Sequence, residues 1–251
     1  MKSRLLIRTF VLSVLKEAAI APEAALKSGL ALAEIADERS NNTAFILYKP
    51  SHFQERVNEL LNKAKEAGSD LSTQKRDLGS LLFDDPTGIV GYVEVKPDDG
   101  GCYDAYSIVY TAAEKGYGPM MYDIAMSRVD SHTLVPDRKS VSKAAENVWA
   151  RYLNGRSDVE KLPLDDITNP KTKPKEDDCT VHTGVPKDSP LNYAYRGTPN
   201  AGGSLISAHY NFLSTIIKQL KAAGLVKTSP NQIETNLFYA GEGYFSSRYK
   251  N

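Results

Sequence analysis

The sequence has little cysteine, no excess of either charge and no long uncharged apolar run. Two cysteines stand in 251 residues, Cys102 and Cys179, which is too few for a disulfide framework and favours a reducing compartment. The 31 lysines and arginines are balanced by 31 acidic residues, so the composition gives no indication of tight sequence-independent binding to nucleic acid. A membrane-spanning helix needs a stretch of roughly 18 apolar residues, and none is present, so we expect no membrane span.

Several familiar catalytic and metal-binding signatures are absent as well. The chain contains no Gly-x-Gly-x-x-Gly, no Gly-Lys-Ser/Thr and no Gly-x-Ser-x-Gly, so the usual dinucleotide loop, the P-loop and the hydrolase nucleophile elbow are missing. Cys179 and His182 stand beside Asp177 and Asp178 and offer atoms that bind zinc, but a second pair at useful spacing is lacking. We therefore expect no metal site. His209 lies on the apolar face of a helical pattern, where we expect a hydrogen-bonded core residue.

The N-terminal 20 residues superficially resemble a secretory signal, because two basic residues precede an apolar run. Arg8 interrupts that run, and apolar residues recur at three- and four-residue spacing, so we predict an amphipathic docking helix over 3–19, with the signal as the less favoured alternative. Pro22 stands at a favoured first-turn position of a second predicted helix over 22–36. The two helices would form a helical hairpin within residues 1–40.

The remainder of the chain predicts an α/β (α+β) fold, a mixed sheet flanked by helices. We expect strands at 43–48, 88–95, 104–111 and 133–135, and helices at 51–67, 119–129, 142–155 and 205–225. Residues 41–160 would be the core and 161–203, which is rich in proline and without periodicity, a long loop or linker. Residues 204–251 would supply a C-terminal helix and a tyrosine-rich tail that pack on the core.

The segment 88–126 carries the clearest chemical signal. Two strands joined by strong turn residues should form a hairpin, and the second strand leads into Gly116-Tyr117-Gly118-Pro119 at the start of a helix. The first turn of a helix presents unpaired backbone N–H groups and a positive dipole end, which suit a phosphate. Glycines allow a ligand to approach the backbone closely. We therefore predict a phosphate-bearing ligand at this turn.

Residues 113–118, Ala-Glu-Lys-Gly-Tyr-Gly, resemble motif A of the GNAT acyltransferases, in which a strand leads into Gln/Arg-x-x-Gly-x-Gly/Ala and a helix. The preceding hairpin and the following short strand and helix have the family order, and the resemblance covers about residues 43 to 155. Acetyltransferase-like proteins of bacteriophages carry a similar Gly-x-Gly-Pro helix followed by Pro-Asp-Arg, here 136–138. Two positions depart from the family pattern, because Ala113 replaces the leading Gln/Arg and Trp149 replaces a tyrosine.

The resemblance implies a GNAT-like core at 41–160 that binds acetyl-CoA or another acyl-CoA and transfers the acyl group to an amine by direct attack. The cofactor-binding residues would be Ile108, Val109, Tyr110, Thr111, Lys115, Gly116, Tyr117, Gly118 and Met120. Glu94 would act as base if its side chain faces the cleft, and strand alternation allows solvent equally well. Tyr152 would act as acid, since it follows Trp149 by one turn on the same helix face.

A second hypothesis is a non-enzymatic structural or interaction protein, including a phage virion component, that keeps a GNAT-like scaffold. Its interfaces would be the amphipathic N-terminus and the tyrosine-rich tail. Under the first hypothesis the partners are an amine-bearing small molecule or protein acceptor, and under the second a homo-oligomer or virion neighbours. The expected location is the cytoplasm, meaning the host cytoplasm or the virion for a phage protein.

Overall fold

The computed structural model describes residues 21–37, 40–66, 85–98, 102–137, 140–197 and 203–223, together with 230, 233–234 and 236–241. The predicted helix at 3–19 lies outside these residues, as do Tyr244, Phe245 and Tyr249 of the tyrosine-rich tail. No helix among the described residues is both long and apolar enough to cross a membrane.

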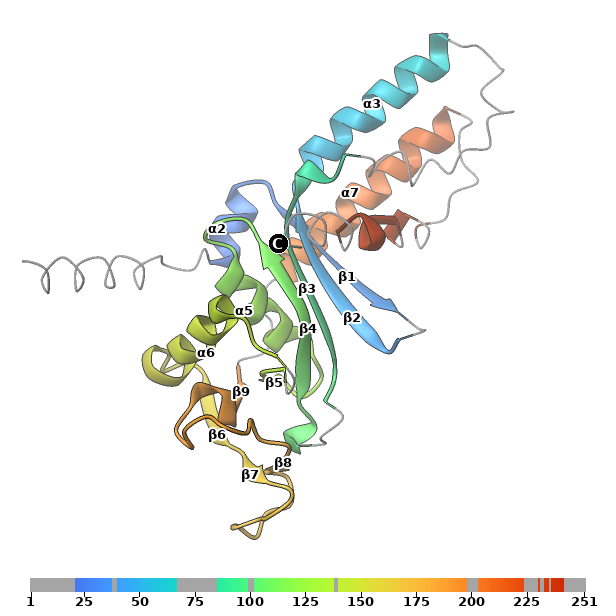
Figure 1. Ribbon diagram of the computed structural model, residues 1–251. Helices are drawn as coiled ribbons and strands as arrows, with labels where there is room; N and C mark the ends of the chain where they lie inside the picture. Colours follow the sequence, from blue (N-terminus) through green and yellow to red (C-terminus); the bar gives the residue numbers. More distant parts are fainter. Residues whose placement is uncertain are drawn as a thin grey trace, which may run out of the picture.

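The fold is α+β, with a seven-stranded mixed sheet in the order β1-β2-β3-β4-β5-β9-β6 (Figure 1). Four long strands make up one half, namely β1 (Ala31–Asp37), β2 (Asn42–Tyr48), β3 (Ile89–Pro97) and β4 (Tyr106–Ala113), each antiparallel to the next. The other half is made of three short strands, β5 (Thr133–Val135), β9 (Tyr193–Arg196) and β6 (Glu160–Pro163). The halves are joined by the parallel pair β4 and β5.

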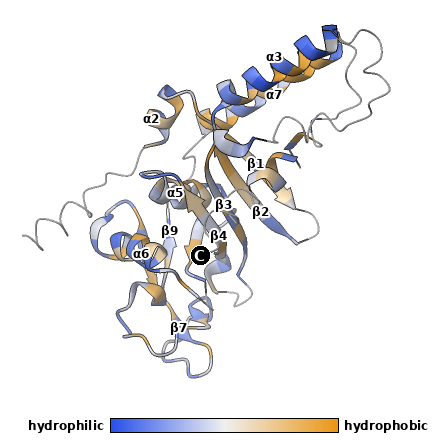
Figure 2. Ribbon diagram, turned by 45° about the horizontal axis from the view of Figure 1, so that its top comes forward, coloured by the Kyte–Doolittle hydropathy of each residue, from blue (hydrophilic) through white to orange (hydrophobic). Residues whose placement is uncertain are grey.

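Helices cover both faces of the sheet. On one face, α5 (Gly118–Arg128) and α6 (Lys143–Gly155) enclose the larger hydrophobic cluster, to which α5 contributes Met120, Met121 and Ile124. The second cluster lies on the opposite face and joins α7 (Gly203–Ala222) to the side chains of alternate residues in β1, β2 and β3. In Figures 1 and 2, α3 (Pro50–Glu66) and α7 lie side by side and extend beyond the sheet.

Most of the predicted core elements are present with nearly the predicted bounds. The hairpin β3–β4, helix α5, strand β5 and helix α6 follow one another as expected, and Ser142 caps α6 by accepting a hydrogen bond from the backbone N–H of Ala145 at 3.2 Å. His209 is the hydrogen-bonded core residue that the pattern predicted. Its ring nitrogens lie 2.8 Å from the Tyr48 hydroxyl and 3.1 Å from Glu234 Oε1.

The predicted helix at 22–36 is wrong beyond its first turns. The helix α2 (Pro22–Lys27) ends where Gly29 adopts a φ of 74°, and the N–H of Leu30 reaches back to the carbonyl of Ala25. This is a Schellman ending, which turns the chain out of the helix. Residues 31–37 then form β1, because pairing with β2 satisfies their backbone and outweighs the helical preference of their alanines.

The segment 161–203, predicted as a long loop or linker, contains strands. It contains most of β6, a small parallel pair of β7 (Asp165–Asp166) and β8 (Asp178–Cys179), and the strand β9 within the main sheet. Strand β9 inserts between β5 and β6, and it supplies the buried Tyr195 and Ala194 to the core. Its pairing partners are distant in sequence, so local periodicity does not reveal it.

The two cysteines are bonded to each other, which the preference for a reducing compartment did not predict. Cys102 and Cys179 form a disulfide with a Cα–Cα distance of 5.3 Å, and both residues are buried. They lie in a third, smaller hydrophobic cluster with Ala105, Val135 and Ala194. The bond connects the start of β4 to β8 across 77 residues of sequence. Because Cys179 is in the disulfide, its sulfur is not available to a metal together with His182.

Candidate functional site

The candidate site is a cleft that opens where β4 and β5 separate. The two strands pair only through Tyr106 with Leu134 and Ser107 with Val135. From Ile108 to Ala113, β4 continues without β5 beside it, and a cleft of about 550 Å³ lies along this edge. Its other walls come from the first turns of α5, from Asp137, and from lining residues within 140–149, which include the first half of α6.

Beyond Ser107, the edge of β4 turns backbone N–H groups toward the cleft side, where β5 does not pair with it. The N–H of Glu114 donates to the carbonyl of Val90 on β3 at 2.8 Å. In an antiparallel pair, the residues that bond to the partner strand alternate with residues whose N–H groups point the other way. The N–H groups of Thr111 and Ala113 therefore point away from β3, toward the cleft side. Six residues of strand give this wall a length of about 17 Å.

A β-bulge lies at the inner end of the same edge. Glu94 on β3 stands opposite Tyr110, and the next residue, Val95, stands opposite Ile108. Val109 is therefore the extra residue, and its side chain is 43% exposed while it lines the cleft. Bulges redirect side chains and end regular pairing, which is the local cause of the widening between the strands.

The glycine turn forms the outer end of the cleft. Gly116 has a φ of 90°, a conformation that favours glycine, and the N–H of Tyr117 donates to the carbonyl of Glu114 at 3.1 Å. Gly118 begins α5 and lines the cleft, and a Cβ on it would meet no atom within 4 Å. Pro119 has no N–H, and the N–H of Met121 donates to the carbonyl of Tyr117 at 3.1 Å, so the first turn of α5 offers the N–H groups of Gly118 and Met120 together with its positive dipole end.

The other predicted residues of this turn have different surroundings. The side chain of Lys115 is exposed, whereas that of Met120 is fully buried in the core. Met120 can therefore contact a ligand only through its backbone. Neither residue lines the cleft. Five of the predicted cofactor-binding residues do line it: Ile108, Val109, Tyr110, Thr111 and Gly118.

Tyr122 is a lining residue that the sequence reasoning missed. It follows Gly118 by four residues on α5, which places both on one side of the helix, and that spacing was the available signal. Burial raises the pKa of the Tyr122 hydroxyl to about 12, an effect that the neighbouring Thr111 hydroxyl opposes. The Tyr122 phenol is therefore protonated across the neutral range.

Trp149 closes the inner part of the cleft from α6. The indole stacks on Tyr195 with ring centroids 5.2 Å apart. It also makes T-shaped contacts with Tyr122 and Tyr152, whose ring centroids lie 5.1 Å and 5.8 Å from its own. Only 1% of Trp149 is exposed, although it lines the cleft. Trp149 stands where the resemblance to the GNAT acyltransferases would expect a tyrosine, and it is a core aromatic residue with ring contacts to three tyrosines.

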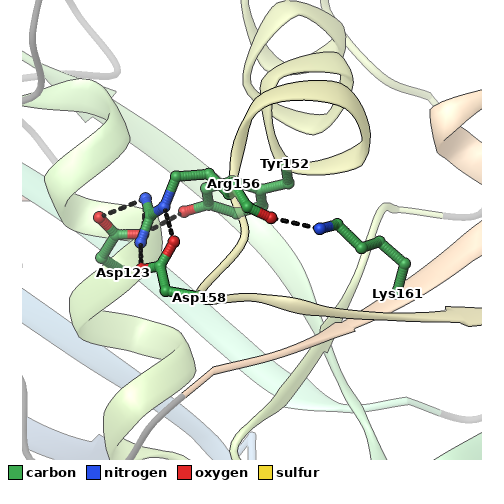
Figure 3. A network of polar contacts seen from close by, with 5 residues as sticks. All are labelled: Asp123, Tyr152, Arg156, Asp158 and Lys161. Atoms are coloured by element: carbon green, nitrogen blue, oxygen red, sulfur yellow. Dashed lines mark hydrogen bonds and ion pairs between the residues drawn. The ribbon is translucent and has the colours of Figure 1, made fainter.

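The structure places Tyr152 away from the cleft. Its hydroxyl donates to Asp123 Oδ1 at 2.7 Å, and Arg156 binds both oxygens of Asp123, at 3.0 and 3.1 Å (Figure 3). Arg156 also pairs with Asp158, and Lys161 donates to the Arg156 carbonyl. Burial, followed by the charge of Asp123, raises the pKa of Tyr152 well above its usual value. The phenol is thus part of a network that ties α6 to α5.

Glu94 does not line the cleft either. It shares a face of β3 with Tyr92, whose hydroxyl donates to Glu94 Oε2 at 3.1 Å, and Asn42 donates to Glu94 Oε1 at 2.5 Å. Tyr92 belongs to the hydrophobic cluster on the face opposite α5. Among the described lining residues, the carboxylate is that of Asp137, just after β5.

Comparison with family models, with curated proteins and with solved structures finds no match for this chain. The described residues also contain no group of three or more histidine, cysteine or acidic side chains arranged to hold a metal ion.

Proposed function

We propose that this protein is an acyl-CoA-dependent N-acyltransferase that binds its acyl-CoA in the cleft between β4 and β5. One observation carries the proposal: the edge of β4 beyond its short pairing with β5 and the glycine that begins α5 line the same cleft. Acyl-CoA combines two groups that suit these two surfaces, a pyrophosphate and an amide-containing pantetheine arm.

The pyrophosphate fits the outer end of the cleft. The first turn of α5 favours an anion through its N–H groups and its dipole. The open space beside Gly118 leaves room for close approach. The exposed Lys115 lies in the same turn, and its positive charge adds to the attraction at moderate salt.

The pantetheine arm fits the strand edge. It carries two amide groups, which can pair with the N–H groups and carbonyls of a free edge as an added strand does. The N–H groups of Thr111 and Ala113 point to that side. With the pyrophosphate at Gly118, an arm that runs along β4 brings the thioester to the bulge at Val109 and the inner end of the cleft.

The reaction needs an amine nucleophile and a proton for the leaving thiolate. The amine nitrogen forms a bond to the thioester carbon, the C–S bond breaks, and the sulfur takes a proton. Tyr122 supplies that proton in this proposal, because its buried phenol lines the cleft and stays protonated at neutral pH. Asp137 is the lining carboxylate that would accept the proton of the amine.

The direct test is calorimetric titration with acetyl-CoA, comparing Gly118→Glu with the wild type. A carboxylate at the first residue of α5 should repel the pyrophosphate and weaken binding by at least about tenfold. Gly203→Glu is the matched control, since Gly203 begins α7, lies outside the cleft lining and would also place its Cβ in open space. Absent binding, or equal loss in both variants, would overturn the proposal.

A non-enzymatic binding or structural role is the second candidate. The observation in its favour is that Tyr152 and Glu94 are both held by structural hydrogen bonds outside the cleft. Release of free CoA thiol from acetyl-CoA over a panel of primary amines separates the two roles. Binding without release from any amine would favour the second candidate, and release that Tyr122→Phe lowers would favour the first.

A further inference from the structure

We infer that Tyr122 and Trp149 form an inner wall that limits the acyl group of the bound thioester to a short chain. This inference rests on the proposed function and names the residues that set the substrate class.

At the inner end of the cleft, burial increases from the surface to the floor. Val109 at the bulge is 43% exposed and Ser140 on the opposite wall is exposed as well. Ile108, where β4 leaves β5, is 8% exposed, and Tyr122 and Trp149 are 4% and 1% exposed. All of these residues line one cleft. An acyl chain that enters past Val109 therefore meets the two aromatic rings rather than solvent.

Residues outside the cleft contact the Trp149 ring and connect the two helices of the wall. Trp149 stacks on Tyr195, whose hydroxyl donates to the carbonyl of Pro190 at 2.7 Å. Trp149 also contacts the ring of Tyr152. The Tyr152 hydroxyl donates to Asp123, and Arg156 donates to the same carboxylate (Figure 3). Asp123 lies on α5, one residue beyond Tyr122. The same network thus joins the helices that carry the two wall residues, and a ligand that displaced the Trp149 ring would have to disturb its stack on Tyr195.

This arrangement predicts how affinity changes with acyl length. In a cleft with an open inner end, each added methylene would be buried and would strengthen binding by about fourfold. Against a fixed wall, a longer chain must displace a ring or leave the cleft, so affinity should fall instead. The acetyl group, whose alkyl part is a single methyl, is short enough to fit in front of such a wall.

The experiment titrates the full chain with free CoA, acetyl-CoA, butyryl-CoA and hexanoyl-CoA. In the wild type we expect hexanoyl-CoA to bind at least about tenfold more weakly than acetyl-CoA. Trp149→Phe, which keeps a ring on Tyr195 but shortens the wall, should reduce this preference, and Trp149→Ala should reverse it. Phe45→Leu is the matched control, because Phe45 is a buried member of the same hydrophobic cluster outside the cleft lining.

The outcomes separate the inference from the proposed function. If wild-type affinity rises with acyl length while free CoA binds, the wall does not limit the chain and the inference is overturned, although acyl-CoA binding stands. If free CoA and every thioester fail to bind, the proposed function falls and the inference with it. If Phe45→Leu also changes the preference for acetyl-CoA over hexanoyl-CoA, the change in the Trp149 variants comes from lost stability, and the role of Trp149 is overturned. The wild-type series needs no variant to fold.

Discussion

The two halves of the sheet are held together by different kinds of interaction. Strands β1 to β4 are seven to nine residues long and pair over almost their full length around large hydrophobic clusters. Strands β5, β9 and β6 have three or four residues each, and there the disulfide, the aromatic stack on Trp149 and the Asp123–Arg156 network supplement short ladders. The candidate cleft opens where the long ladder stops and the short one begins.

The comparison shows how a sheet can contain a binding cleft without losing its core. Helix α5 crosses the junction, with Met121 packed on Gly91 of the first half and Met126 on Gly197, which follows β9 in the second. The gap between β4 and β5 therefore has a continuous packed layer over one face. The following predictions test how independent the two halves are.

The largest effect is expected from removal of the disulfide. Cys102→Ala combined with Cys179→Ala should lower the free energy of unfolding by about 4 kcal/mol, because the bond closes a loop of 77 residues. Urea denaturation measures the loss, and reduction of the wild type should reproduce it. Hydrogen exchange should rise in β5, β9 and β6 and remain slow in β1 to β3. Equal acceleration in both halves would mean that they unfold as one unit.

A smaller effect is expected at the two glycines under α5. A Cβ at Gly91 would lie 2.7 Å from Met121 Sδ, and a Cβ at Gly197 would lie 2.6 Å from Met126 Sδ. We expect Gly91→Ala to cost about 2 kcal/mol and Gly197→Ala about 1 kcal/mol, because the short strands can shift more easily. Urea unfolding measures both costs.

Each methionine provides a control for its glycine. In a Met121→Ala background the added methyl of Gly91→Ala meets no sulfur, so its cost should largely disappear, and Met126→Ala should do the same for Gly197→Ala. A larger cost at Gly197 than at Gly91 would contradict the view that the second half is the more adaptable one.

The smallest effect concerns Asp158, which belongs to the network of the second half. The hydrogen bond from Arg156 lowers the pKa of Asp158, so its contribution to stability is present above the ordinary carboxyl pKa of about 4 and is lost as pH falls through the lower folded value. Asp158→Asn should cost about 0.5 kcal/mol at pH 7, because the carboxylate is largely exposed. In urea titrations the difference from wild type should shrink below pH 4, and a difference that grows there would have the wrong sign.

Local signals predicted the central part of the fold. The turn residues between β3 and β4, the cap at Ser142 and the apolar stripe of α7 each act within a few residues of sequence, and all three elements formed as expected. Strands β1 and β9 were missed because their stability depends on partners elsewhere in the sheet. The alanines in 31–37 favour a helix when the segment is considered alone, and only the pairing with β2 makes it a strand. Likewise, β9 is a strand because it pairs with β5 and β6, which are distant in sequence.

Of the residues predicted to bind the cofactor, the five that line the cleft lie on β4 or at the first residue of α5. The strand edge and the turn at Gly118 follow from residue order, whereas the side chains depend on the register of β3 and the rotation of α5 and α6. Glu94 lies on the face away from α5, and Tyr152 is held by Asp123, so neither reaches the cleft lining. Tyr122 does so because four residues make about one helical turn from Gly118.

The disulfide also gives the cleft an unusual covalent topology. Every lining residue lies between Ile108 and Trp149, within the closed ring that runs from Cys102 to Cys179. The exposed lysines 171, 173 and 175 belong to the same ring. A protease that cuts the backbone at one of them converts the ring into an open chain but produces no separate fragment. Both walls of the cleft remain attached to one molecule after such a cut, for as long as the sulfur–sulfur bond is intact.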